Sequence, residues 1–433
     1  MITDMDANRF ATHSLNDPRI MRILSAAIEA VDPYKAVQKY LPNLSGRVYG
    51  LAIGKASIAM LTALAEHYPL SGALAISKHA SFPTPNLFPV FLGSHPIPDS
   101  RSLEAGTRVI DFVSALQEDD TLVCLISGGG SALVTAPYNG ITLEDMQALT
   151  SLMLSCGARI DEFNTIRRHL DRVKGGGLIR ATKAEIISLI LSDVIGNPLE
   201  AIASGPTFPN PTTNADALKI LKKYNIENRV TDSILKTLES ASLLPDVQQH
   251  TLTGTRAVGL QRQNIIIGDN KLAAQAAVEQ AQREGIHAEI LTNELQGEAR
   301  DIGIMLAERL RIRAEQMTRP FCLIAGGETT VTIKGNGKGG RNQELALSAV
   351  NELRGLENVL LIALATDGED GPTDAAGAVV TGESAQRAES LGVGVADHLS
   401  RNDAYVCFDQ LNDLLKIGPS GTNVNDLIFL IAL

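Results

Sequence analysis

The sequence predicts an α/β protein with two domains, each a β-sheet covered by helices on both faces. Short apolar runs alternate with longer segments of helical periodicity along the chain, and such alternation is typical of parallel sheets built from strand–helix–strand units. The chain has 433 residues, which is more than one hydrophobic core usually contains. Hydrophobic residues make up 44% of it and charged residues 20%, a globular composition that argues against disorder and coiled coils.

The expected strands are short runs that stay apolar on both faces, as buried parallel strands do. In chain order they are Val48–Ile53, Ala73–Ser77, Leu122–Ser127, Ile186–Ser192, Ile265–Ile267, Cys322–Ala325 and Leu360–Thr366. The expected helices carry apolar residues three and four positions apart. In chain order they are Ile20–Ala30, Ala56–Glu66, Ser102–Leu116, Leu143–Ser155, Lys271–Glu284, Gly297–Glu315 and Asn342–Leu353.

Two further expectations concern the second half of the chain. The segment Val331–Lys334 follows a turn and predicts a hairpin edge, which would make the second sheet mixed. The run Leu427–Leu433 is apolar to its last residue, so we expect a buried strand there.

The domain boundary is expected within Pro245–Arg262, which shows no sustained period and contains a proline and two glycines. Such residues interrupt regular elements and are typical of connecting segments. We therefore assign residues 1–255 to an N-terminal domain and residues 256–433 to a C-terminal domain.

Charge and cysteine usage exclude several classes of partner. The net charge of −11 argues against nucleic acid and anionic membranes, which require a clustered basic surface. The four cysteines are scattered without paired spacing, so we expect free structural thiols in a reducing compartment. No basic stretch followed by an apolar one begins the chain, and no apolar run approaches the roughly 18–20 residues of a membrane span. A cytoplasmic location is expected.

A glycine loop, Ser127-Gly128-Gly129-Gly130-Ser131, follows the expected strand Leu122–Ser127. In open α/β sheets, ligands bind at the carboxyl ends of strands. Consecutive glycines allow successive backbone N–H groups to point toward one anion, and serine hydroxyls can add donors. The loop therefore favours phosphate or carboxylate binding, with a tight turn as the alternative.

A second glycine loop is basic. Residues 334–344 match the pattern G-x-G-x-x-G and precede an expected helix, which by itself is a weak signal. Arg341 stands at the start of that helix, where a cation opposes the helix dipole unless an anion lies beside it. The candidate anion-binding residues here are Lys338, Gly339, Gly340, Arg341 and Asn342; a solvated basic loop is the alternative.

A third loop, Thr366–Asp374, carries four carboxylates after an expected strand. Carboxylate oxygens are the ligands that Mg²⁺ prefers, although Asp is also common in turns and caps. Asp367 is the preferred metal ligand, Asp374 is a weaker candidate, and Glu369 is expected to be solvated.

Charged residues follow three other strands. Lys55 lies after Gly54 at the end of the first strand, but the segment is not a Walker A loop because Ala56 replaces the Ser or Thr that would hold Mg²⁺. Asp193 is a candidate general base or metal ligand, with a cap as the alternative.

Glu328 is similarly placed after a strand, behind Gly326 and Gly327, and these three residues are candidates for binding substrate or phosphate. The eight histidines show no metal-ligand spacing, so a zinc site is not expected.

Together these motifs resemble the class II glycerate kinases, whose C-terminal part is called the MOFRL domain. The matching segments of the first half are Gly54–Ala56, His95–Asp99, Ser127–Ser131, Lys174–Gly177, Leu191–Gly196 and Ser204–Thr207. Those of the second half are Gly339–Glu344, Thr366–Gly368 and Gly418–Asp426, where Ser420 replaces the family's usual Thr.

The resemblance implies two α/β domains, the first Rossmann-like and mostly parallel, the second a smaller MOFRL-type mixed sheet, with the active-site cleft between them. It implies an ATP-dependent glycerate 2-kinase that converts D-glycerate to 2-phosphoglycerate with Mg²⁺. The partners would be these small molecules, and the chain would be a monomer or a homodimer. Lys55 and Arg341 match positions expected to be catalytic or substrate-binding, followed by Asp193, Glu328 and Asp367.

In this interpretation Lys55 and Arg341 hold the glycerate carboxylate and the γ-phosphate, and the glycine loops donate backbone N–H groups. Asp193 accepts the hydroxyl proton and Asp367 helps to hold Mg²⁺, or the two exchange roles.

Two other classes of function compete. Family members have also been labelled hydroxypyruvate reductases, so an NAD(P)H-dependent reductase is the alternative. A dehydrogenase, however, needs its glycine motif in the first strand–helix turn of a unit, with an acidic residue about 20 positions later, and here the motif lies late in the chain. A non-catalytic anion-binding protein would have no use for the carboxylates of residues 366–374.

Overall fold

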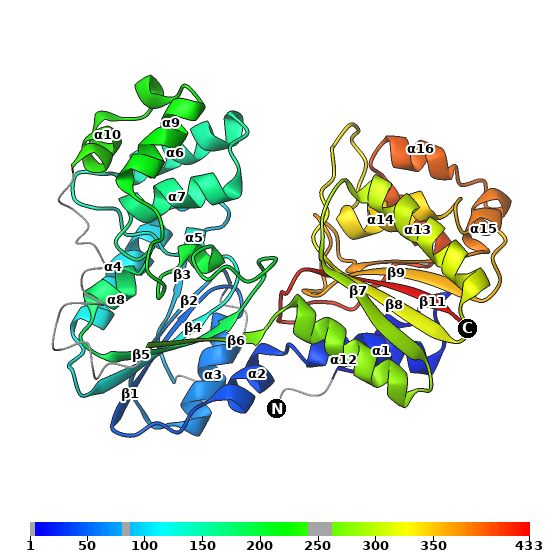
Figure 1. Cartoon of the computed structure of the whole chain (residues 1–433), viewed down its shortest axis with the longest axis horizontal. Coiled ribbons are helices and arrows are strands. Elements are labelled where there is room, and N and C mark those ends of the chain that lie inside the picture. The colour runs from blue at the N-terminus through cyan, green and yellow to red at the C-terminus, as the bar shows by residue number, and fades with distance from the viewer. Residues whose placement is uncertain (1–4, 80–86, 241–261) are drawn as a thin grey trace. The chain divides into compact units, whose positions relative to one another are not determined.

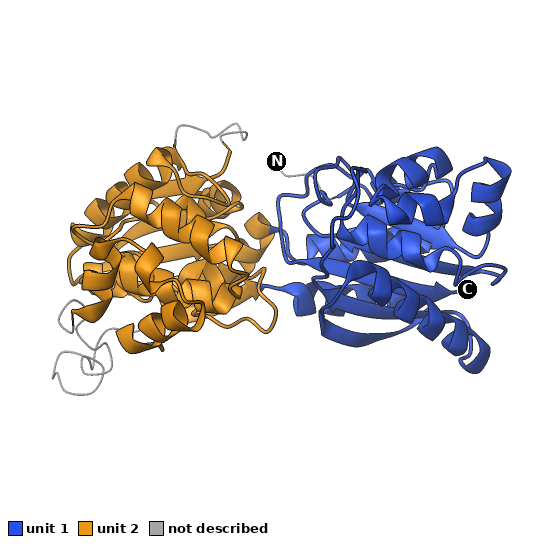
Figure 2. Cartoon of the chain, turned by 90° about the horizontal axis from the view of Figure 1, so that it is seen from above, with its two compact units in different colours: residues 1–32, 268–433 blue, residues 33–267 orange. Residues whose placement is uncertain are grey.

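The computed structural model describes residues 5–79, 87–240 and 262–433 (Figure 1). The chain forms two compact units. Residues Pro33–Ile267 form the middle unit, and Met1–Asp32 together with Gly268–Leu433 form the terminal unit (Figure 2). The boundary predicted between residues 255 and 256 lies outside the described residues.

The middle unit contains a six-stranded sheet in the order β3-β2-β1-β4-β5-β6. Its strands are β1 (Arg47–Ile53), β2 (Leu70–Ser77), β3 (Val90–Leu92), β4 (Asp120–Ile126), β5 (Glu185–Leu191) and β6 (Arg262–Gly268). The described pairings among β1 to β5 are all parallel, as the apolar runs predict. The carboxyl ends of β1, β4 and β5 consequently lie side by side at one edge.

Helices cover this sheet because their apolar stripes match its apolar faces. They include α2 (Pro33–Tyr40), α3 (Ser57–His67), α4 (Ser100–Ser114), α5 (Gly130–Leu133) and α8 (Gly177–Ala181). Helix α4 begins where the Asp99 side chain accepts hydrogen bonds from the backbone N–H groups of Arg101 and Ser102, which satisfies donors that the helix leaves unpaired. Its buried Val109 and Val113 join the core of the sheet.

A second layer of helices has a core of its own. It consists of α6 (Leu143–Ser155), α7 (Ile160–Leu170), α9 (Asn214–Lys223) and α10 (Asp232–Glu239). Helix α7 was not expected from the sequence because it buries polar residues as well as apolar ones, Asn164, Arg167 and Arg168 among them. No helix in the described part of the chain is long and apolar enough to cross a membrane.

The terminal unit contains a five-stranded mixed sheet in the order β10-β9-β11-β8-β7. Its strands are β7 (His287–Leu295), β8 (Phe321–Gly327), β9 (Val359–Ala365), β10 (Gly377–Thr381) and β11 (Asp426–Ala432). Strand β11 lies antiparallel between β8 and β9, so its first residue meets the last residues of both neighbours. The predicted buried C-terminal strand is confirmed.

The predicted hairpin edge at Val331–Lys334 is wrong, because this segment forms no strand. The backbone N–H groups of Lys334 and Gly335 donate instead to Asn402 Oδ1. The sheet is mixed for another reason, namely the antiparallel pairing of β10 and β11 with β9.

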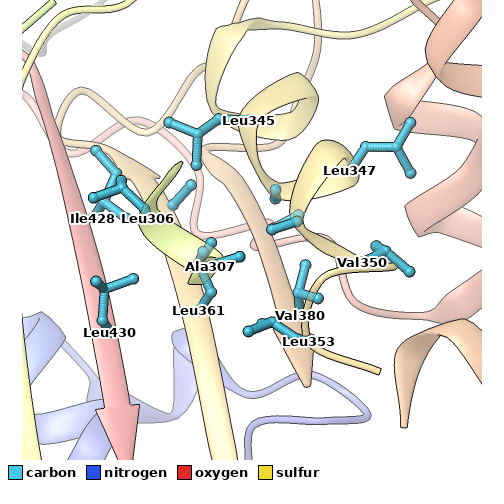
Figure 3. Close-up of a cluster of buried hydrophobic side chains, with 14 of the residues drawn as sticks. Leu306, Ala307, Leu345, Leu347, Val350, Leu353, Leu361, Val380, Ile428 and Leu430 are labelled. Atoms are coloured by element: carbon cyan, nitrogen blue, oxygen red, sulfur yellow. The ribbon is translucent and has the colours of Figure 1, made fainter. Parts of the chain in front are cut away.

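Helices lie on both faces of the terminal sheet (Figure 1). They include α12 (Asn270–Arg283), α13 (Ala299–Gln316), α14 (Arg341–Ala349), α15 (Ser384–Ser390), α16 (Val395–Ser400) and α17 (Ala404–Leu411). Leu306 of α13 and Leu345 of α14 pack on Leu361 and Ile428 of the strands (Figure 3).

Residues 1–32, which the sequence analysis assigns to the N-terminal domain, belong to the terminal unit. Helix α1 (Pro18–Glu29) packs along α12, and Arg22 forms a two-pronged ion pair with Glu284 of that region. The periodicity of α1 predicts which of its faces is buried, but it does not identify the helix that covers that face.

Candidate active site

The middle unit brings together the loops that follow β1, β4 and β5. Ile53 is paired with Ile126, and Ile126 with Ile190, so Lys55, the 127–131 loop and Asp193 follow neighbouring strand ends. Lys55 N donates to Gly128 O at 2.9 Å, and Ala56 N donates to Ser127 Oγ at 3.0 Å. These bonds connect the lysine directly to the glycine loop.

The glycine loop presents a row of backbone donors. The N–H groups of Gly128, Gly129, Gly130 and Ser131 donate to no acceptor among the residues that the structure describes. Gly129 has a φ of +84°, which turns the chain into the short helix α5. Unpaired N–H groups in succession at a strand end are suited to binding an anion.

Asp193 lies against the glycine loop. A Cβ on Gly128 would be 2.0 Å from Asp193 Oδ2, so only glycine allows the carboxylate this close. Burial raises the pKa of Asp193, and the positive charge of Lys55 opposes this rise without cancelling it. A carboxylate with a raised pKa beside a cation is suited to proton transfer.

A hydrogen-bonded chain supports the far end of the loop. Ser131 Oγ and Ser204 Oγ lie 2.8 Å apart, and Ser204 Oγ donates to Asn164 Oδ1 of α7. Ala203 and Ser204 have φ values of +50° and +61°. Such backbone conformations cost about 1–3 kcal/mol each and concentrate at functional sites.

In the terminal unit, Arg341 is paired with two carboxylates of the chain itself. Its Nε donates to Asp426 Oδ2 at 2.6 Å and its Nη2 to Asp426 Oδ1 at 3.1 Å, while Nη1 lies 2.8 Å from Glu328 Oε1. Burial lowers the pKa of Arg341, but the bonds and charge of Asp426, with Glu328 and Asp370, outweigh it and raise the pKa overall. The anion expected beside this cation is therefore present as protein carboxylate.

Asp370 caps the helix that Arg341 begins. Its carboxylate accepts from the backbone N–H groups of Asn342 at 3.1 Å and Gln343 at 2.9 Å. The backbone N–H of Asn342, which was expected to be available to substrate oxygens, is thus occupied. Burial and the charge of Asp426 raise the pKa of Asp370 to about 7.

The remaining acidic residues of residues 366–374 are spread out. Asp367 Oδ1 accepts from Glu369 N at 3.2 Å, and Asp374 accepts from the Tyr405 hydroxyl at 2.6 Å. Among the described residues, no three His, Cys, Asp or Glu side chains gather as a metal site. The loop can offer Mg²⁺ one or two carboxylates but not a complete protein cage.

The other predicted residues of the terminal unit lie in two places, one near Arg341 and the other near Tyr405 and Asp403. Gly326 and Gly327 end β8 just before Glu328, close to Arg341. The exposed Lys338 lies over the Tyr405 ring at 3.8 Å, and its backbone N–H donates to Asp403 Oδ1. Gly339 and Gly340 lead from this segment to α14.

The contacts of Asp426, Asp370, Ser204 and Asn164 in these clusters were not predicted, although Ser204 and Asp426 lie in segments that resemble the family and Asp370 was counted among the carboxylates of its loop. Asp426 could have been noticed as the charged residue that opens an otherwise apolar strand. Its importance depends on the antiparallel orientation of β11, which periodicity does not report.

The fold and these clusters define an α/β enzyme with basic and acidic side chains at strand ends, suited to anionic substrates. Residues 19–239 match a family described as a domain of unknown function, DUF4147, and residues 321–426 match the MOFRL family. A D-glycerate 2-kinase of Thermotoga maritima is 40% identical over 418 residues, which cover 94% of this chain and 96% of that protein. The chain belongs to the glycerate 2-kinase family, a family of kinases with a C-terminal MOFRL domain.

Solved structures agree with this assignment. The crystal structure of the Thermotoga maritima glycerate kinase matches with a TM-score of 0.87 at 39% identity, covering 95% of this chain and 98% of that one. The predicted α/β class, with one parallel and one mixed sheet, is confirmed. A relative from Agrobacterium vitis, 37% identical over 94% of this chain and 92% of its own, carries the provisional name hydroxypyruvate reductase.

Proposed function

We propose that this protein transfers the γ-phosphoryl group of ATP to the 2-hydroxyl of D-glycerate, giving 2-phosphoglycerate and ADP. The observation that carries the proposal is the 40% identity with the Thermotoga maritima D-glycerate 2-kinase over 96% of that protein's length. The strand-end clusters supply the groups that phosphoryl transfer needs, which are mainly charge neutralisation and positioning.

Lys55 and the 127–131 loop would bind anionic oxygens of the reactants. The lysine side chain is exposed, and its backbone is hydrogen-bonded to the loop whose N–H groups are unpaired. A fixed row of donors next to an ammonium group stabilises developing negative charge without reorganisation.

Asp193 would accept the proton of the attacking hydroxyl. Its raised pKa makes it a stronger base than an exposed carboxylate, and the Lys55 charge keeps it ionised over a wider pH range. The missing side chain of Gly128 leaves room for this carboxylate beside the loop, because a Cβ there would lie 2.0 Å from Asp193 Oδ2.

Arg341 would bind a phosphate or carboxylate of the reactants by exchanging one partner. Asp426 is buried and engages two guanidinium nitrogens, whereas the Glu328 side chain is 45% exposed and engages Nη1 alone. Glu328 is therefore the partner that an incoming anion would displace, and Asp426 would keep the fork oriented.

Mg²⁺ would be held by Asp367 or Asp193 together with phosphate oxygens. The donor set fits this ion, because Mg²⁺ in kinases is usually bound by one or two carboxylates plus substrate. When bound, it would neutralise charge on the transferring phosphate.

A coupled assay tests the proposal. D-glycerate, ATP and Mg²⁺ are incubated with the protein, enolase, pyruvate kinase and lactate dehydrogenase, without phosphoglycerate mutase, and a reaction without enolase is the control. We expect NADH loss that requires enolase. Loss that appears only after mutase is added would place the phosphate on the 3-hydroxyl.

The reductase alternative is kept because of the name given to the Agrobacterium vitis relative. It predicts NADH loss with hydroxypyruvate alone and no phosphorylated product. The cytoplasmic location and the monomeric or homodimeric state stay predictions.

A further inference from the structure

Helix α7 carries two adjacent buried arginines, of which one is hydrogen-bonded and the other, within the described part of the chain, is not. Arg168 is 4% exposed, and all three of its nitrogens are hydrogen-bonded, to Asn210 Oδ1, Glu200 O and Thr165 Oγ1. Arg167 is 8% exposed, yet its guanidinium forms no hydrogen bond or ion pair with any residue that the structure describes. Burying an arginine without hydrogen bonds is costly, so Arg167 needs another explanation.

The one partner of Arg167 that the structure shows is an aromatic ring. Its Cζ lies 3.7 Å from the centroid of the Phe163 ring, one helical turn earlier. Stacking on a ring fixes the guanidinium while leaving its N–H groups available for an acceptor. Burial lowers the pKa of Arg167 to about 10, so the side chain remains charged at neutral pH.

Asp171 is not that acceptor. Its carboxylate is already bonded to Lys174 Nζ at 2.6 Å, Thr135 Oγ1 at 2.8 Å and the backbone N–H groups of Ala136 and Val173. The Asp171–Lys174 pair is complete without Arg167.

Helix α7 places Arg167 beside the catalytic loops of the middle unit. Asn164, one turn away, receives the hydrogen bond of Ser204, which in turn contacts Ser131 of the glycine loop. Burial lowers the pKa of His95, and the positive charges of Lys55, Lys78 and Arg167 lower it further. A Cβ on Gly129 would lie 3.4 Å from both His95 and Lys55, so these side chains border the same space.

We propose that Arg167 binds the carboxylate of the hydroxy-acid substrate, together with Lys55, at the strand-end loops of the middle unit. This assignment rests on the proposed function. The planar fork of arginine matches the two oxygens of a carboxylate. The row of unpaired N–H groups at residues 128–131 remains for phosphoryl oxygens, and Asp193 remains beside the hydroxyl that reacts.

Arg167→Met tests the assignment, because methionine keeps an unbranched apolar side chain against Phe163. We expect the KM for D-glycerate to rise about 10- to 100-fold, the effect of losing a charge-assisted bond to substrate, with the KM for ATP changed less than about twofold. Arg167→Lys should restore part of the affinity. Arg172→Gln, which removes an exposed charge five residues along, is the matched control and should change neither constant.

Thermal unfolding separates binding from a structural role. Removing an unpaired buried charge should leave the Tm unchanged or raise it, whereas Arg168→Met should lower it because that arginine is fully bonded. D-glycerate should raise the Tm of the wild type but not that of Arg167→Met, and glycerol, which lacks the carboxylate, should raise neither.

Each other outcome overturns the assignment. A lower Tm for Arg167→Met, or failure of this variant to fold, would make Arg167 structural. An increase confined to the KM for ATP would mean that Arg167 binds a phosphate group and not the substrate carboxylate. An unchanged KM for D-glycerate, in an enzyme whose wild type phosphorylates it, would refute the assignment and leave the proposed function standing. A wild type that phosphorylates no glycerate would refute the function instead, and binding of D-glycerate would still test Arg167.

Discussion

Arg341 is already engaged on three of its nitrogens by carboxylates of the chain. Asp426 is 2% exposed, and two carboxylates, Asp426 and Asp370, lie near the same guanidinium. The arginine therefore neutralises buried negative charge in the folded protein, whatever it contributes to the proposed reaction. Losing one member of a buried ion pair is costly because the other charge remains.

Arg341→Lys retains the positive charge but loses the planar guanidinium that binds a carboxylate through two nitrogens. We expect kcat to fall by about 100-fold or more, because a single ammonium group cannot bind Asp426 through two nitrogens and still orient a substrate anion. Steady-state kinetics measures the loss, and circular dichroism checks that the fold is kept. Arg354→Lys, at an ion pair whose arginine is 49% exposed, is the control and should be neutral. Near-normal activity of Arg341→Lys would refute the role assigned to Arg341.

Asp370 should make stability depend on pH. Its pKa is raised from 3.8 to about 7 in the folded protein, so the folded state holds a proton that the unfolded state releases. The free energy of unfolding should therefore fall as pH rises from about 4 to about 7. In Asp370→Asn, which does not titrate, this part of the fall should be absent. Urea unfolding across that pH range measures the free energy of unfolding of both proteins. An equal fall with pH in the wild type and in Asp370→Asn would contradict the pKa shift.

At the scale of helices and strands, hydrophobic periodicity predicts most of the large elements. Apart from the hairpin edge predicted at Val331–Lys334, which forms no strand, each predicted strand and helix has a counterpart in the described residues, because buried strands and amphipathic helices have distinct patterns. Among the elements that were not predicted are the short β3, the partly exposed β7 and helix α7, which buries polar residues. The loops after β1, β4 and β5 were predicted as candidate site loops because parallel strands end at one edge. The pairing of Arg341 with Asp426 was not predicted, since it depends on which strands lie antiparallel.

The close packing of the β4 and β5 loops gives a prediction for Gly128→Ala. The added Cβ would lie 2.0 Å from Asp193 Oδ2, so the carboxylate must move. A displacement of this size costs about 100-fold in rate when the displaced group takes part in the reaction. Kinetics and a Tm measurement test it together. Gly394→Ala, where the nearest atom is an ordinary 3.5 Å away, should retain full activity. An active Gly128→Ala enzyme would exclude Asp193 as the base.

The two compact units of the chain do not follow the order of its sequence. Residues 1–32 complete the terminal unit: Ser14 N donates to Asp413 Oδ1 at 2.8 Å, and Thr422 Oγ1 donates to Val31 O at 2.7 Å. Leu24 of α1 is fully buried. The stability of the terminal unit should therefore depend on residues that precede the middle unit.

Leu24→Ala tests this dependence. Removing a buried leucine costs about 2–5 kcal/mol, and the loss should fall on the terminal unit. Hydrogen exchange should show faster exchange in β8 and β11, with β1 and β4 unchanged. Leu64→Ala, at an equally buried site in α3 of the middle unit, should give the reverse pattern. Equal acceleration in both sheets by each variant would show that the two units unfold together.

The glycerate 2-kinase assignment is tested most directly by phosphorus NMR of the product formed from D-glycerate and ATP. In 2-phosphoglycerate the phosphorus is coupled to the single proton on C2, so we expect a doublet that grows with ADP. A triplet, from the two protons on C3, would mean that the 3-hydroxyl is the acceptor and that Asp193 does not serve the 2-hydroxyl. No new phosphoester signal would contradict the kinase assignment itself.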